Sequence, residues 1–273
     1  MPDSSGLLAY TIDPNTGALS AISSLPYDTG NSPEDIQIDS SGKFVYVDSI
    51  SPPEITGFQI DQSTGALQSI PASPFAASET PFLMAASSNF LYASSTDVPG
   101  GVLGFRINVS GVLSALPASP FGAGQSTVSV ALQSSGAYAA VLSDATQAVA
   151  SWKIDQSSGA LSPTGTPLAI GSTPQLAIVS PQGFVYVSAA DGIHGYAIDQ
   201  ATGALTAISS APFGPTSGPI LLDPSSKFLF TVSADDTGIV TYSVGSTGML
   251  TQVSKTPSGT VLFTNLAAAK VTH

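Results

Sequence analysis

The chain has 273 residues, no cysteine, and 18 acidic against 6 basic side chains, which gives a formal net charge of -12. This length suits one large domain or two small ones. The absence of cysteine excludes disulfides, thiolate metal sites and cysteine nucleophiles, and the shortage of Lys and Arg excludes a nucleic-acid partner, because phosphate binding needs clustered cations.

The predicted elements repeat along the chain. A strand over residues 7–12 comes first and is followed by a glycine-centred hairpin signal, Thr16-Gly17-Ala18-Leu19. A Pro-led apolar stretch at 33–39 and an aromatic, β-branched run at 43–47 then read as two more strands. Each repeat is predicted to hold four short strands, A to D in chain order, and the last strand A is expected at 261–269. The hairpin glycine recurs every 44 to 48 residues, at Gly65, Gly111, Gly159, Gly203 and Gly248.

Repeats of about 40 to 50 residues with four strands each are typical of propeller blades. We therefore predict an all-β fold, a β-propeller of four-stranded antiparallel blades, with residues 1–273 as a single domain. The closing blade lacks a strand B of its own, so either another segment fills the gap or the chain is a trimmed piece of a longer one. An exposed edge at this gap could also recruit a strand from a second copy of the chain. Complete blades are expected at about 31–72, 80–118, 126–165, 173–210 and 218–254, and a sixth, closing blade from 1–25 and 258–273.

Three motifs carry a resemblance to a known family: FxIDxxTGAL at Phe58–Leu67, SPF with a following glycine at Ser119–Gly122, and SGKFVYV at Ser41–Val47. With these motifs the chain resembles the lactonase-type β-propellers built from YVTN repeats, which include 6-phosphogluconolactonase-like proteins and carboxymuconate lactonising enzymes. The resemblance implies seven blades and a central funnel in which His, Arg and carboxylate groups act, with Arg binding anionic groups of the substrate.

Few residues are available for such a centre. The chain has one arginine, Arg106, and two histidines, His194 and His273, and no position matches a catalytic motif of the family. His194 follows Asp191 at the start of a strand C and is the candidate general base, since imidazole titrates nearest neutrality. The alternative for His194 is a packed or surface histidine.

Aspartates follow strand B in each complete blade. In a propeller the B-to-C and D-to-A connections share one face, and by this assignment that face carries a charge of about -10 against about -2 on the other, with Lys255 as its one cation. Such a face is predicted to attract a cation or a basic partner; turn capping is the alternative role. The predicted ligand or cation face consists of Asp48, Asp97, Asp144, Asp191, Asp235 and Asp236.

Two function classes stay open. The sequence favours a non-catalytic binding or scaffold propeller for a protein, a glycan, a cation or a small molecule, because catalytic cations are not evident. The alternative is a lactonase-type hydrolase or cyclase that acts on a small lactone in the funnel. No cofactor is predicted, and no metal site, because the aspartates of different blades splay apart whereas calcium needs six to eight oxygens.

The expected location follows from the same features. No apolar run is long enough to predict a membrane span. A secreted or periplasmic location is expected, with any leader already removed, and the cytoplasm is the alternative.

Overall fold

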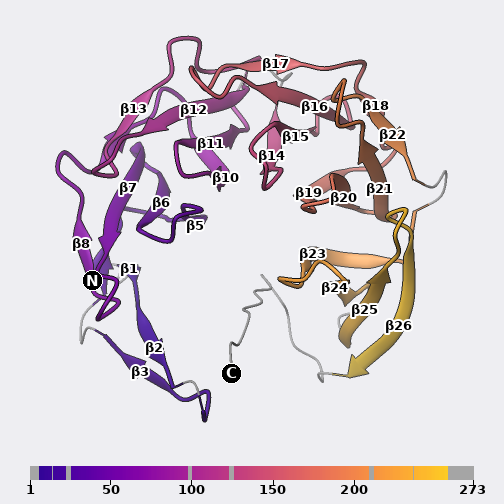
Figure 1. The fold of residues 1–273 in the computed structure, drawn as a ribbon, viewed down its shortest axis with the longest axis horizontal. Coiled ribbons are helices and arrows are strands. Elements are labelled where there is room, and N and C mark those ends of the chain that lie inside the picture. Colours follow the sequence, from indigo (N-terminus) through magenta and orange to yellow (C-terminus); the bar gives the residue numbers. More distant parts are fainter. Residues whose placement is uncertain are drawn as a thin grey trace. The chain divides into compact units, whose positions relative to one another are not determined.

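The computed structural model describes residues 6–13, 15–22, 26–97, 100–122, 126–208, 212–235 and 237–257. These residues form two compact units, and each is described by itself. The first holds the described residues up to 122 together with 158–160, and the second holds 126–157 and 161–257. Every regular element of the described ranges is a β-strand (Figure 1), which confirms the all-β prediction. The single-domain prediction stays a prediction.

Besides two short strand pairs at its N-terminal end, the described part of the first unit contains two larger sheets whose strands follow chain order. The order is β5-β6-β7-β8, with β9 pairing on β7, and then β10-β11-β12-β13. All neighbouring strands are antiparallel, as the hairpin signals predicted. The strands are β5 (Ile36–Ile38), β6 (Phe44–Ile50), β7 (Pro53–Ile60), β8 (Leu67–Ser69), β9 (Phe75–Ala76), β10 (Pro81–Ala86), β11 (Phe90–Ser95), β12 (Val102–Ile107) and β13 (Leu113–Ala115).

The second unit contains three sheets of the same kind. Their orders are β14-β15-β16-β17 with β18 on β16, then β19-β20-β21-β22, then β23-β24-β25-β26. The five four-strand paths of the described residues span 36–69, 81–115, 127–163, 174–207 and 216–257, and the predicted blade bounds stay a prediction. The strands are β14 (Thr127–Leu132), β15 (Tyr138–Ser143), β16 (Ala148–Ile154), β17 (Leu161–Pro163), β18 (Leu168–Ala169), β19 (Pro174–Val179), β20 (Phe184–Ala189), β21 (Gly192–Ile198), β22 (Leu205–Ala207), β23 (Thr216–Leu222), β24 (Phe228–Ser233), β25 (Gly238–Val244) and β26 (Leu250–Pro257).

The N-terminal region forms two short strand pairs. The strand expected over residues 7–12 is divided into β1 (Gly6–Leu7) and β2 (Tyr10–Ile12), which pair with β4 (Tyr27–Asp28) and β3 (Leu19–Ala21) respectively. The expected last strand A at 261–269 lies outside the described residues. The shared closing blade and self-association through it therefore stay predictions.

A buried hydroxyl ties each of several hairpins to the preceding sheet. Tyr46 Oη donates to the carbonyl of the hairpin residue Gly111 at 2.8 Å, and Tyr186 Oη donates to that of Gly248 at 2.8 Å. Tyr92 makes the same 2.8 Å bond to Gly159, which belongs with the first unit. These glycines have positive φ angles near 80°, a conformation that favours glycine over all other residues.

In one sheet a different residue donates the hydrogen bond to the hairpin glycine carbonyl. In β15 the register position of these tyrosines is taken by Ala140, which has no hydroxyl. Here Thr164 Oγ1 donates to the carbonyl of Gly203 at 2.8 Å. Thr164 stands where the equivalent turns carry Ile70, Leu116 or Ile208. The hydroxyl now comes from the residue that follows β17, and it also lies 2.8 Å from the carbonyl of Ser151, which accepts the backbone N–H of Thr164 as well.

Pro-Phe pairs return the chain to the third strand of their own sheet. Phe75 lies in β9, which pairs with β7, and Phe121 and Phe213 form single bridges to Val102 of β12 and Ile193 of β21. The last sheet differs, because β26 pairs with β25 along its whole length, from Leu250 to Pro257.

Candidate functional site

Asp48 departs from the prediction that grouped it with the loop aspartates. It lies within β6 and is fully buried, so it is no part of an exposed face. Its Oδ1 accepts the backbone N–H groups of Glu34 and Asp35 at 3.0 and 2.6 Å, and its Oδ2 has no partner among the described residues. Burial raises the pKa of Asp48 to about 7, against the lowering effect of these two N–H groups and with the help of the Asp35 and Glu34 charges. Asp48 is a buried structural group.

Asp35 links two sheets of the first unit. Its Oδ2 accepts the backbone N–H of Met84 in β10 at 2.7 Å. Burial raises the pKa of Asp35, although this bond and others lower it in part. In the second unit the equivalent position is Ser129, whose Oγ accepts the N–H of Ala177 at 3.1 Å. The recurrence of the contact shows that Asp35 serves the packing of neighbouring sheets.

Two further predicted residues support turns. Asp97 Oδ2 accepts the backbone N–H of Thr80 at 2.8 Å. Asp144 holds its turn through the main chain, donating to Ser126 at 3.0 Å and accepting from Gln147 at 3.2 Å. Both side chains are half-buried. Asp236 and His273 lie outside the described residues.

Asp191 and His194 lie together in the second unit. Asp191 is in the turn between β20 and β21, and its Oδ1 is 2.9 Å from Nε2 of His194, the third residue of β21. The exposed fractions of the side chains are 44% for Asp191 and 15% for His194. Partial burial raises the pKa of Asp191, but hydrogen bonds from His194 and Ser172 outweigh this, and the net shift is downward. The sequence prediction placed both residues but not the contact.

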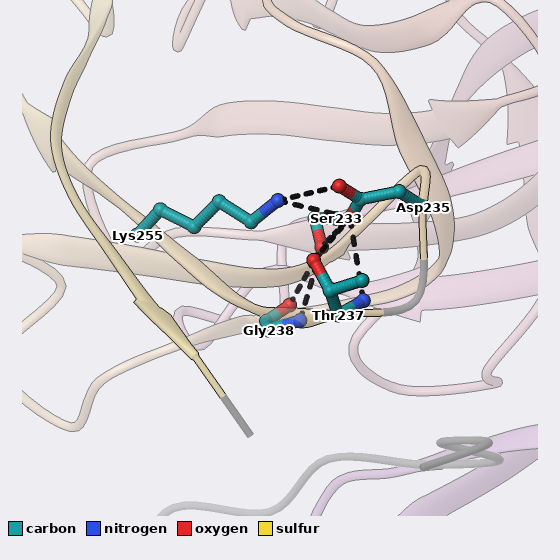
Figure 2. Close-up of polar contacts among 5 residues, drawn as sticks. All are labelled: Ser233, Asp235, Thr237, Gly238 and Lys255. Atoms are coloured by element: carbon teal, nitrogen blue, oxygen red, sulfur yellow. Dashed lines mark hydrogen bonds and ion pairs between the residues drawn. The ribbon is translucent and has the colours of Figure 1, made fainter. Parts of the chain in front are cut away.

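Asp235 occupies the equivalent turn of the next sheet, and its partner is Lys255 (Figure 2). Lys255 Nζ lies 2.9 and 2.7 Å from Oδ1 and Oδ2 of Asp235. The hydroxyls of Ser233 and Thr237 lie 2.6 and 2.7 Å from Oδ1. Lys255, and after it these hydroxyls, hold the pKa of Asp235 well below its usual range. The carboxylate is therefore fixed in position and ionised.

A cavity of about 320 Å³ opens beside this ion pair. That volume is at the lower end of small-molecule sites, which run from about 300 to 1,000 Å³. Tyr242 and Val240 give it an apolar side, and burial raises the pKa of Tyr242, so its hydroxyl stays a hydrogen-bond donor. The only charged residues of the lining are Asp235 and Lys255, and the full lining is Pro215, Ser233, Ala234, Asp235, Val240, Tyr242, Gln252 and Lys255.

The chemistry of the cavity follows from the donors it presents. A lysine ammonium has three N–H groups and no acceptor. Two of them serve the two oxygens of Asp235, which leaves the third for a ligand oxygen. Sequence reasoning missed Lys255 as a site residue, although its position as the one cation of the acidic rim was a usable signal.

The described ranges contain no group of three His, Asp or Glu side chains placed to hold a metal ion. Within the same ranges, no helix is long and apolar enough to span a membrane. Arg106, the one arginine, lies with its guanidinium carbon 4.9 Å from the centre of the Phe90 ring, in β12 of the first unit.

The sequence matches a described family over most of its length. A profile of the family described as "Lactonase, 7-bladed beta-propeller" matches residues 3–80 and 183–270. The second range contains the cavity and the Asp191–His194 pair. The comparison with curated proteins found no match.

Solved structures share the fold. The periplasmic gluconolactonase of Pseudomonas aeruginosa is 18% identical, with a TM-score of 0.70 over 91% of this chain and 78% of that one. A protein from Lactobacillus plantarum is 20% identical, with a TM-score of 0.72 over 93% and 80% of the two chains. A candidate 6-phosphogluconolactonase of Bacteroides fragilis is 16% identical, with a TM-score of 0.54 over 93% and 91%. These likenesses confirm the β-propeller predicted from the repeats.

Proposed function

The chain belongs to the lactonase family of seven-bladed β-propellers, and from this premise we propose that it hydrolyses a small sugar lactone. The observation that carries the proposal is the family match, whose second range includes every residue of the cavity beside Lys255. This is the alternative of the sequence analysis, and the family match favours it over a non-catalytic scaffold. The name of the Pseudomonas aeruginosa relative, a gluconolactonase, suggests the first substrate to test.

The reaction is the addition of water to a cyclic ester. Water attacks the carbonyl carbon, the ring C–O bond breaks, the ring oxygen takes a proton to become a hydroxyl, and the new carboxylic acid gives its proton to solvent. Negative charge develops on the carbonyl oxygen as water adds. A fixed cationic donor aimed at that oxygen stabilises the transition state more than the ground state.

Lys255 is the proposed donor. Its Nζ is held by both carboxylate oxygens of Asp235 and keeps one N–H for the lactone carbonyl. Tyr242 and Val240 offer an apolar wall to the ring carbons, and Gln252 offers an amide to a sugar hydroxyl. These groups bind and polarise a small, polar, cyclic substrate.

The test is hydrolysis of glucono-1,5-lactone, followed as acid release at constant pH with the spontaneous rate subtracted. We expect Lys255→Met, which keeps the length of the side chain and removes its charge, to lower kcat/KM on the order of 100-fold, the usual effect of losing one oxyanion donor. Lys153→Met changes an exposed lysine of β16 outside the cavity and is the matched control.

The variants also separate the competing sites. If the wild type hydrolyses the lactone no faster than the spontaneous rate, the proposed hydrolase activity is refuted. A non-catalytic binding or scaffold function is then favoured. Loss of activity in His194→Gln but not in Lys255→Met would place the chemistry at the Asp191–His194 pair instead.

A secreted or periplasmic location is proposed on related grounds. It is supported by the structural likeness to the gluconolactonase of Pseudomonas aeruginosa, which is named as a periplasmic protein. Fractionation of cells that express the protein from its natural gene, with the cytoplasm as the competing result, tests this proposal.

A further inference from the structure

The two charges at the cavity cancel each other. Lys255 Nζ contacts both oxygens of Asp235, and these two residues are the charged members of the lining. Lys255 keeps one N–H for a ligand oxygen, but a ligand that carries a full negative charge also meets the carboxylate beside that ammonium. An anionic ligand has to share this ammonium with a carboxylate that is next to it.

That carboxylate cannot easily turn away. The hydroxyl of Thr237 is 2.7 Å and the hydroxyl of Ser233 is 2.6 Å from Oδ1 of Asp235, while Oδ2 faces Lys255. Figure 2 shows Ser233, the last residue of β24, and Thr237 on one side of the carboxylate and Lys255 of β26 on the other. Like charges in fixed positions repel, and the whole chain adds a net charge of -12 to this local effect.

We infer that the Asp235–Lys255 pair makes the cavity selective for an uncharged sugar lactone and against anionic ones, including the carboxylate that hydrolysis produces. The inference rests on the proposed function and adds a substrate class to it. A phosphorylated lactone carries charge before the reaction and is excluded for the same reason. The unphosphorylated lactone enters neutral and becomes an anion when the ring opens, so Asp235 favours release of the product.

The inference is tested by binding, with three probes of one size class. Gluconolactam is a stable neutral analogue of the lactone, gluconate is the anionic product, and 6-phosphogluconate carries further charge. Dissociation constants are measured by calorimetry for the wild type, for Asp235→Asn and for Asp235→Ser, the last as a second variant in case the first does not fold.

We expect the wild type to bind gluconolactam at least tenfold more tightly than gluconate or 6-phosphogluconate. Removing the carboxylate frees the Lys255 charge, so both Asp235 variants should bind gluconate about tenfold more tightly than the wild type does. Raising the salt concentration should weaken the gain, because screening acts on the charged probes alone.

Equal or tighter binding of gluconate by the wild type, unchanged gluconate binding in the Asp235 variants, or no binding of any probe would overturn the inference. The result is independent of turnover. A protein that prefers gluconolactam but hydrolyses no lactone would refute the proposed function and leave the selectivity standing. A protein that hydrolyses the lactone but does not prefer gluconolactam would support the proposed function and refute the selectivity.

Discussion

At the scale of single residues, neutral hydroxyls make the contacts that join neighbouring sheets. Tyr46, Tyr92 and Tyr186 are fully buried and each satisfies the carbonyl of a hairpin glycine. The exchange of the tyrosine for Ala140, with Thr164 as the new donor, shows that the hydrogen bond persists while its donor changes. A buried carbonyl without a partner costs about 1 to 3 kcal/mol, which explains why the bond is kept.

Thr164 gives a direct test of this contact. We expect Thr164→Val, which keeps the shape and removes the hydroxyl, to lower the free energy of unfolding by about 1 to 2 kcal/mol, since the Gly203 carbonyl is left without this donor. Thr164→Ser keeps the hydroxyl and is the control. Urea unfolding of the two variants measures the difference, and equal stabilities would show that the hydroxyl contributes nothing.

Asp48 makes stability depend on pH in a definite direction. Its pKa is raised to about 7 in the folded state, above the ordinary value of 3.8, so the folded protein holds the proton more tightly than the unfolded chain. This contribution is fully present below pH 3.8 and is lost as pH rises through 7. Between pH 5 and pH 8 the loss from this group is on the order of 2 kcal/mol.

Replacement of the carboxyl by an amide removes this titration. We expect the unfolding free energy of the wild type to fall between pH 5 and pH 8 and that of Asp48→Asn to change less over the same range. Asp35→Asn is measured in parallel, because burial raises the pKa of Asp35 too. An Asp48→Asn profile parallel to that of the wild type would contradict the assignment.

The position of Asp48 also shows why the sequence prediction of the site was incomplete. Asp48 follows the first strand residue Phe44 by four positions and stays inside β6, whereas Asp97, Asp191 and Asp235 follow their phenylalanines by seven and reach the turn. The sequence pattern located an aspartate near the end of each strand B. Whether that aspartate is buried depends on how many residues separate it from the start of the strand. Lys255 is 20 residues from Asp235, in β26, so no local pattern paired these two residues in advance. His194 is three residues from Asp191, so the sequence showed that they are neighbours but not that their side chains are in contact.

At the scale of elements, small residues of the third strand accommodate the Pro-Phe segments. A Cβ on Gly104 of β12 would lie 2.8 Å from the Phe121 ring and 2.9 Å from Leu116. Gly57 and Gly195 face Phe75 and Phe213 in the same way. In β25 the equivalent position is Thr241, and there β26 continues in its place. A glycine in the third strand therefore occurs in the sheets where a Pro-Phe segment packs against that strand.

A single methyl group tests this fit. We expect Gly104→Ala to lower the free energy of unfolding by about 1 to 3 kcal/mol, because the Cβ overpacks the contact with Phe121. Gly122→Ala is the control, since no heavy atom lies within 4 Å of a Cβ at that position, and we expect a change within about 0.5 kcal/mol. Thermal unfolding with equal losses in both variants would mean that the ring moves aside.

The elements themselves were largely predictable. Period-two patterns and turn glycines are local signals, and they located the four strands of each complete blade and the hairpins between them. Local patterns do not predict that Phe75 pairs with β7 or that β26 is long. Both pairings depend on the side chains of the third strand in the sheet.

At the scale of the whole molecule, the family match and the shared fold of solved structures fix the architecture, while the proposed chemistry is assigned to one cavity of the second unit. The predicted gathering of acids on one face stays a prediction. Its described members divide into the buried Asp48, the turn residues Asp97 and Asp144, Asp191 with its hydrogen bond to His194, and the ion-paired Asp235.

The location of a bound ligand tests the central claim most directly. In a crystal of the wild-type protein soaked with gluconolactam, we expect density for the ring against Tyr242 and Val240, with the carbonyl oxygen within hydrogen-bond distance of Lys255 Nζ. Density at any other place, with this cavity filled only by solvent, would contradict the claim that the Asp235–Lys255 corner binds the lactone.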